Sequence, residues 1–144
     1  MTYSGFDIAK VIIFYGNQHN IPINNLKLQK LLYLLWVDYY KETHQHLFEE
    51  RFYAWAYGPA VPSIYYVYYL SKSAPLASAE APKLTPFDKR WLIAALGRYV
   101  PLPVKDLVDM VRKSGSPWEK VYKKRSDGQG KFPFRSIELS VSMF

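Results

Sequence analysis

The segment that organises the predicted fold reads N-L-K-L-Q-K-L-L-Y-L-L-W-V, residues 25–37. Its leucines recur so densely that apolar side chains cover more than one face of the predicted helix. Asn24 or Asn25 can cap the start of this helix, which we expect to continue to about Glu42. Because a helix that is apolar on several sides must be covered by its neighbours, we expect it to lie at the centre of the domain.

Further helices are predicted where a capping residue or a proline precedes a helical pattern. They are expected from Ser4 to the 16–20 region, from Pro62 or Ser63 to about Ser71, from Thr85 to about Tyr99, from Pro103 to about Lys113, and from Ser116-Pro117 onward. Residues 47–57 alternate with a period of two and predict a short strand or strand pair that Gly58-Pro59 ends. Residues 137–144 can form a last short helix or strand. The predicted fold class is therefore mainly α: one compact domain over residues 1–144, with about six helices and one small β-strand pair around residues 47–57.

Composition excludes several classes of protein. The 144 residues contain no cysteine, which removes disulfides, thiolate metal sites and cysteine nucleophiles. The start of the chain lacks the basic and apolar regions of a signal peptide. No apolar run is longer than Leu31 to Val37, which is too short for a membrane span. We therefore expect a cytoplasmic protein that does not enter a membrane.

The whole net charge of +7 lies in residues 83–144, since residues 1–82 carry equal numbers of basic and acidic side chains. The cations concentrate at Arg112, Lys113, Lys120, Lys123, Lys124, Arg125, Lys131 and Arg135. Such a basic patch attracts nucleic acid or an acidic partner, although a solvated helix end and loop would have the same composition.

Chemistry-bearing residues are sparse. The histidines His19, His44 and His46 do not have the spacing of a metal site, and no nucleophile, zinc or phosphate-loop motif is present. We therefore predict no catalytic residues, no metal and no cofactor. A hydrolase or transferase with an unfamiliar site remains an alternative that would require a deep polar pocket with perturbed carboxylates.

Tyrosine and tryptophan carry the strongest functional signal. Residues 52–70 contain six tyrosines and one tryptophan, and four of these tyrosines lie within residues 65–69. A helix turns about 100° per residue, so these rings cannot all face inward. Because tyrosine and tryptophan are enriched where proteins bind proteins, we expect part of this segment to be a binding surface. Base stacking is the competing use, but the aromatic segment is poor in charge and the cations lie mostly beyond residue 82.

Three strings together resemble one known family. They are N-L-K-L-Q-K-L-L-Y at 25–33, A-W-A-Y-G-P-A-V-P-S-I-Y at 54–65 and S-P-W-E-K-V at 116–121. In this order, after a first helix that begins D-I-A-K, they resemble the Panacea domain, also called the SocA-like antitoxin domain, of bacterial and phage toxin–antitoxin pairs. Members often carry a histidine a few residues before the P-W pair, where this chain has Arg112 as the nearest equivalent.

The resemblance implies a helical cytoplasmic domain without enzymatic activity that neutralises a cognate protein toxin by binding it. Delivery of the toxin to a AAA+ protease is a further implied role, and nucleic-acid binding is the less favoured alternative. The predicted partner-binding residues are Trp55, Tyr57, Gly58, Pro59, Pro62, Tyr65, Tyr66 and Tyr69. The predicted supporting residues are Lys27, Gln29, Lys30, Tyr33, Pro117 and Trp118. We expect Lys27, Gln29 and Lys30 to pair with polar groups of the Gly-Pro segment, and Gly58 to supply a backbone shape that other residues do not tolerate.

Overall fold

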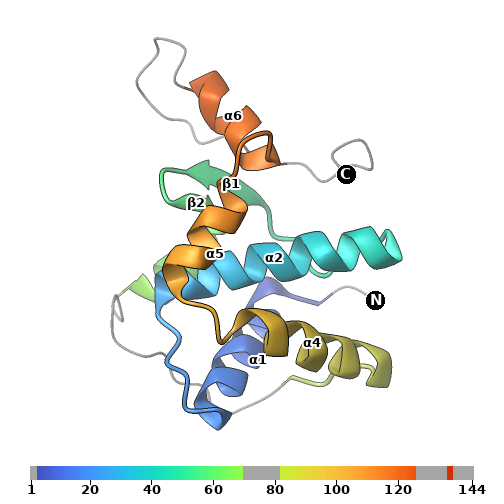
Figure 1. Ribbon diagram of the computed structural model, residues 1–144. Coiled ribbons are helices and arrows are strands. Elements are labelled where there is room, and N and C mark those ends of the chain that lie inside the picture. The colour runs from blue at the N-terminus through green and yellow to red at the C-terminus, as the bar shows by residue number, and fades with distance from the viewer. Residues whose placement is uncertain (1–2, 70–81, 126–135, 138–144) are drawn as a thin grey trace.

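Helix α2, Asn25–Thr43, runs through the middle of the computed structural model, which describes residues 3–69, 82–125 and 136–137 (Figure 1). The Asn24 side chain caps it by accepting a hydrogen bond from the Lys27 amide at 2.8 Å. Every residue from Leu28 to Trp36 is buried, because other elements pack around this helix. Its neighbours are α1 (Gly5–Gln18), α4 (Pro86–Tyr99), α5 (Val104–Val111) and strand β2 (Gly58–Ala60). The central position predicted for this helix is confirmed.

The predicted helix starts are also confirmed. The Ser4 hydroxyl accepts hydrogen bonds from the Phe6 and Asp7 amides at the start of α1. The Thr85 hydroxyl caps α4 by accepting from the Asp88 amide at 3.1 Å. Helix α3, Pro62–Val67, is shorter than predicted and ends four residues before Ser71.

A small antiparallel sheet covers the other side of α2. Its strand order is β2-β1-β3, where β1 is Phe52–Trp55 and β3 is Ser136–Ile137. The strand pair was predicted, but the expectation that Gly58-Pro59 ends the extended segment was wrong, because these residues begin β2 after a turn. The prediction for the last eight residues falls mostly outside the described residues, and only Ile137 is described, in β3.

Helix α6, Pro117–Arg125, lies over the sheet at the opposite end of the molecule from α1 and α4 (Figure 1). It is joined to the sheet by Trp118, whose indole N–H donates to the Trp55 carbonyl at 2.7 Å. The described part of the chain therefore comprises six helices and one small sheet, in a mainly α fold. None of the helices described is long and apolar enough to cross a lipid bilayer.

A buried carboxylate ties the start of the chain to α2 and α4. Asp88 accepts hydrogen bonds from the hydroxyls of Tyr3 at 2.7 Å, Tyr39 at 2.9 Å and Thr85 at 2.8 Å. Burial raises the pKa of Asp88, but the three hydrogen bonds outweigh it and hold the pKa below its ordinary value. Asp88 is thus a structural anion that ties these three segments together.

Candidate partner-binding site

An aromatic surface, which we define as Trp55, Tyr57, Tyr65, Tyr66 and Tyr69, is formed by the β1–β2 hairpin and the α3 region. Tyr57, Tyr66 and Tyr69 are 69%, 64% and 43% exposed, whereas Trp55 and Tyr65 are half-buried. The expectation that some of the rings of this segment face solvent is therefore confirmed.

The rings of the aromatic surface hold one another in place. The Trp55 and Tyr65 ring centroids lie 5.2 Å apart, edge to face, and Tyr66 packs edge to face on Tyr65 at 5.5 Å. Tyr69 lies 5.9 Å from Tyr65 and 6.4 Å from Tyr66. Such edge-to-face and tilted contacts are the arrangements that aromatic rings prefer, so the exposed rings of Tyr66 and Tyr69 are pre-ordered for binding.

The aromatic surface borders a pocket of about 510 Å³. The pocket is lined by Asn24, Asn25, Leu26, Gln29, Lys30, Trp55, Tyr57, Gly58, Ala60, Tyr65 and Tyr69. The pocket therefore brings together the first two of the three strings that resemble the Panacea domain, one on α2 and the other on the hairpin and α3. We call these three strings the recognition strings. The two remaining tyrosines of the segment, Tyr53 and Tyr68, are half-buried, and Tyr68 packs against the core.

A chain of buried polar side chains supports this pocket from α2. The Asn25 amide donates to the Tyr65 carbonyl at 2.9 Å, and its oxygen accepts from the Gln29 amide at 3.1 Å. The Gln29 oxygen in turn accepts from the Val61 backbone N–H at 2.9 Å. Lys30 donates to the Pro59 carbonyl at 2.8 Å, so the expected contact between this lysine and the Gly-Pro segment is present.

These bonds leave the pocket rich in donors. The side-chain oxygens of Asn25 and Gln29 each already accept a hydrogen bond, while each amide nitrogen donates once and has a second N–H. A protonated lysine carries three N–H donors, of which Lys30 uses one on Pro59. A partner group that enters the pocket should therefore bind more strongly if it carries hydrogen-bond acceptors.

The two lysines of the first string differ in their surroundings. Burial, reinforced by the nearby Arg112 guanidinium, lowers the pKa of Lys30 to about 7. Burial also lowers the pKa of Lys27, and the ammonium of Lys27 has no hydrogen-bond partner within the described residues. The expected pairing of Lys27 with the Gly-Pro segment is therefore not found there.

Gly58 adopts a backbone conformation that side chains disfavour, with φ at +113°. A Cβ atom added to it would lie 3.0 Å from a Val111 methyl and 3.3 Å from Cε of Lys30. The predicted need for glycine is confirmed by this geometry. Gly58 and Pro59 are themselves buried and Pro62 is half-buried at the start of α3, so we expect them to shape the aromatic surface more than to contact a partner.

The family model described as the SocA-like antitoxin, Panacea domain, matches residues 28–119. The chain belongs to the SocA-like antitoxin family. No curated protein and no solved structure matches it significantly. The matched residues include the pocket-lining side chains Gln29 and Lys30, the hairpin, α3, and Trp118 at the start of α6.

Arg112 connects the second and third recognition strings of this Panacea domain. Its guanidinium lies 4.9 Å from the Trp118 ring centroid, and its side chain lies beside Gly58. Sequence separation had suggested that the cations lie away from the aromatic segment, but the fold brings this cation against it. Trp118 also stacks on Tyr122, with ring centroids 4.7 Å apart, and Pro117 is half-buried at the first position of α6.

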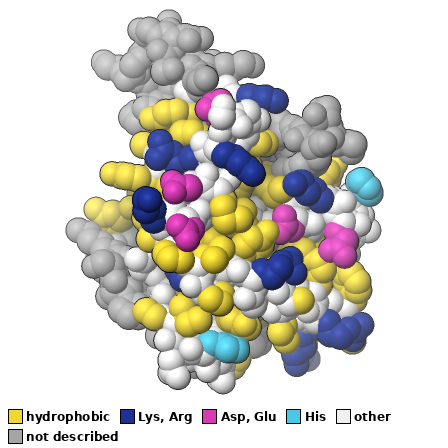
Figure 2. Space-filling model, viewed as in Figure 1, with side chains coloured by type: hydrophobic (Ala, Val, Ile, Leu, Met, Phe, Trp, Pro, Cys, Tyr) yellow, Lys and Arg dark blue, Asp and Glu magenta, His cyan; other side chains and the backbone are white. Residues whose placement is uncertain are grey.

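The predicted basic patch is only partly described. The side chains of Arg112, Lys113 and Lys120 are exposed, Lys123, Lys124 and Arg125 continue α6, and Lys131 and Arg135 lie outside the described residues. On the face in Figure 2, basic and acidic side chains are interspersed and do not gather into a single basic area. A continuous basic surface therefore stays a prediction.

Two contributors were not singled out from the sequence. Asn25 was considered only as a helix cap, yet its amide holds the Tyr65 carbonyl across 40 residues of chain. Arg112 was given no role beside the hairpin, yet it packs between Gly58 and Trp118. The signal that could have identified it was the family resemblance, which implied a histidine before the P-W pair and gave Arg112 as its nearest equivalent.

Proposed function

We propose that this Panacea domain is an antitoxin that binds its cognate protein toxin directly through the aromatic surface. The observation that carries the proposal is the set of exposed rings Tyr57, Tyr66 and Tyr69. Tyr57 and Tyr69 line the pocket, and Tyr66 and Tyr69 are held by contacts with neighbouring rings. Family membership supports the toxin as the partner. We infer that binding, without catalysis and in the cytoplasm, is how the domain acts.

The physical case rests on preorganisation. Tyrosine buries a large rigid area with few rotatable bonds, and its hydroxyl tolerates water in the free state. The aromatic surface is anchored from α2 by Asn25, Gln29 and Lys30, so little conformational entropy is lost when a partner binds. The donor-rich pocket adds a place for an acceptor group of the toxin, such as a carboxylate or a backbone carbonyl.

The proposal is tested with the product of the neighbouring gene. Co-expression of the domain should rescue growth from that product, and the two proteins should elute together from a sizing column. Tyr57→Ala and Tyr66→Ala should each weaken the complex on the order of tenfold, the typical effect at a binding hot spot. Phe87→Ala is the matched control, because Phe87 is a 51% exposed aromatic ring on α4, outside the aromatic surface.

The result that contradicts the proposal is equally direct. A toxin that binds wild type and both tyrosine variants with the same affinity would move the binding site away from the aromatic surface. Failure of the domain to bind or neutralise the neighbouring product would count against the antitoxin role itself.

Delivery to a AAA+ protease is a finer proposal for how neutralisation ends. If the domain is such an adaptor, the half-life of the toxin in cells should shorten when the domain is co-expressed, and it should lengthen again when the protease is deleted. An unchanged half-life with full growth rescue would instead indicate that the domain blocks the toxin by occupying it.

Nucleic-acid binding is a second candidate, favoured by Arg112, which lies beside Gly58 of the hairpin that carries the exposed ring of Tyr57. Aromatic rings next to cations can stack on bases and contact phosphates. This candidate predicts binding to single-stranded DNA or RNA that weakens steeply as salt is raised. Absence of binding at low ionic strength would remove it.

A further inference from the structure

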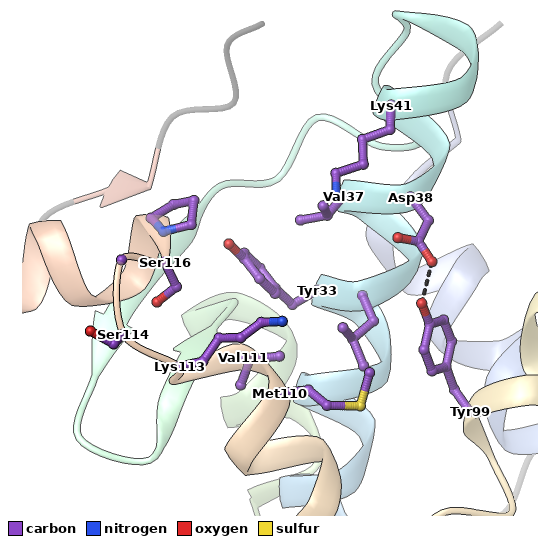
Figure 3. A pocket seen from close by; sticks show the side chains of 13 residues that line it. Tyr33, Val37, Asp38, Lys41, Tyr99, Met110, Val111, Lys113, Ser114 and Ser116 are labelled. Atoms are coloured by element: carbon purple, nitrogen blue, oxygen red, sulfur yellow. Dashed lines mark hydrogen bonds between the residues drawn. The ribbon is translucent and has the colours of Figure 1, made fainter. Parts of the chain in front are cut away.

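A second cavity, of about 330 Å³, lies between α2, the end of α5 and the loop that leads into α6 (Figure 3). It shares no lining residue with the pocket of the aromatic surface. Tyr33 ends the first recognition string, and Ser116 and Pro117 begin the third. The cavity thus joins two of the three strings at a place that the proposed toxin surface does not use.

Tyr33 is the informative residue of this cavity. Its side chain is only 4% exposed, and its hydroxyl is buried with no hydrogen-bond partner within the described residues. A buried hydroxyl without a partner is unfavourable, because it has given up its hydrogen bonds to water and gained none in return. In Figure 3 its ring projects from α2 toward the loop that carries Ser114 and Ser116.

The protonation of Tyr33 defines what the missing partner must be. Burial raises the pKa of Tyr33 well above its ordinary value, so the phenol keeps its proton throughout the physiological range. A phenol O–H that is always protonated has a hydrogen-bond donor to satisfy. The atom that completes the site is therefore an acceptor.

The charges around the cavity indicate that this acceptor is anionic. Lys41 and Lys113 both line the cavity, as do the hydroxyl-bearing residues Ser114 and Ser116. The carboxylate among the lining residues, Asp38, accepts a hydrogen bond from the Tyr99 hydroxyl (Figure 3). The lining side chains thus carry two ammonium groups and one carboxylate, and this net positive charge favours an added anion.

The remaining wall is apolar. It is formed by Leu34, Val37, Met110, Val111 and Pro117. A cavity of this size, with apolar walls and a few converging polar groups, has the character of a small-ligand site.

We propose that this cavity binds a small organic oxyanion, whose oxygen accepts a hydrogen bond from the Tyr33 hydroxyl while Lys113 balances its charge. The apolar wall holds the body of the ligand. The head group is a carboxylate or a phosphate ester, which share the acceptor oxygens and the negative charge that the site requires. This site is independent of the toxin and goes beyond the proposed function.

The experiment uses the full chain and three named probes. Benzoate, phenyl phosphate and the uncharged analogue benzamide are titrated at constant ionic strength, and binding is followed by the backbone amide shifts of residues 110–116 in ¹H–¹⁵N NMR spectra. At least one of the two anions should shift these amides saturably, and benzamide should bind at least about tenfold more weakly, since it lacks the charge. Comparison of benzoate with phenyl phosphate identifies the preferred head group.

Tyr33→Phe separates the proposal from simple surface attraction. It removes the hydroxyl and keeps the ring that packs on Phe52, so anion affinity should fall about tenfold or more. The melting temperature should not fall, because the lost hydroxyl had no partner. Lys113→Gln should also weaken binding, whereas Tyr15→Phe, the same change outside this cavity, should leave it unaltered.

Three results would overturn the proposal. One is the absence of saturable amide shifts at residues 110–116 with either anion. Another is equal binding of benzoate, phenyl phosphate and benzamide, which would show that charge is not recognised. The last is a Tyr33→Phe variant that binds as wild type or melts at a clearly lower temperature, since that would show that the hydroxyl plays no part or already has a partner in the protein.

Discussion

Lys30→Met tests the cost of burying a lysine beneath the Gly-Pro segment, and its effect on stability should depend on pH. Lys30 is 2% exposed and donates to the Pro59 carbonyl, while burial and the Arg112 guanidinium lower its pKa from 10.5 to about 7. Between pH 7 and 10.5 the unfolded chain therefore binds more protons at Lys30 than the folded protein does. The contribution of Lys30 to the free energy of unfolding rises with pH across this window.

The magnitude follows from the shift. At about 1.4 kcal/mol per pKa unit, burial of Lys30 costs about 4 kcal/mol of folding free energy at pH 7 and only about 1 kcal/mol at pH 10. Methionine removes this pH-dependent cost and also removes the hydrogen bond to Pro59, a loss of roughly 1–3 kcal/mol at both pH values. The difference in unfolding free energy between variant and wild type should therefore move by about 3 kcal/mol in favour of wild type from pH 7 to pH 10.

Urea unfolding of both proteins at pH 7 and pH 10 measures this difference. Contributions from groups that titrate alike in the two proteins cancel when the two free energies are subtracted. Lys89→Met, which removes an exposed lysine of α4, reports the effect of the lysine-to-methionine change itself. A Lys30→Met difference that stays constant with pH would refute the reasoning, because it would show that the folded protein does not disfavour the charged form of Lys30. The variant should also bind the toxin more weakly, since the Pro59 carbonyl loses its support.

Three further changes test other parts of the structure. Gly58→Ala should lower the unfolding free energy by roughly 1–3 kcal/mol, because φ is +113° and the new Cβ would press on Val111. Urea unfolding measures this loss, and an unchanged unfolding midpoint would show that alanine is not strained at this position. Asp88→Asn should lower the unfolding free energy by about 1–3 kcal/mol at pH 7. This deficit should disappear in acid, because the hydrogen-bonded carboxylate stabilises wild type above its ordinary pKa and loses that effect as pH falls through the lower folded pKa. Thermal melts from pH 7 to pH 3 measure the deficit, and a deficit that does not change with pH would argue against a role for the carboxylate charge. Trp118→Phe keeps a ring on α6 but removes the 2.7 Å hydrogen bond to the Trp55 carbonyl, so it should lower the unfolding free energy by about 1 kcal/mol and weaken toxin binding. Unchanged affinity in a binding titration would show that α6 does not support the aromatic surface.

The helices were predictable because their signals are local. Asn24, Ser4 and Thr85 each cap the helix that begins directly after them, and each does so with its own side chain. The leucines of residues 26–35 indicated a helix covered on several sides, and the burial of residues 28–36 bears this out. Capping and periodicity act within a few residues, so no tertiary information was needed.

The Gly-Pro segment could not be predicted in the same way. Gly58-Pro59 is typical of a turn, yet it begins a strand, because β1 pairs with it and Lys30 holds the Pro59 carbonyl from α2. Strand pairing depends on which segment lies opposite, and periodicity contains no information about that partner.

The sequence by itself determined a mainly helical domain, its family and the presence of more rings around residues 52–70 than a core could enclose. Only the tertiary structure decided which of these rings face solvent, which polar groups of α2 support them, that Arg112 lies against Gly58, and that the Tyr33 hydroxyl is buried without a partner in the described protein. The physical reason is how far apart along the chain the interacting residues lie. Helix propensity and capping are set by neighbours along the chain, whereas burial, hydrogen-bond satisfaction and pKa are set by residues that come from distant segments and meet only after folding.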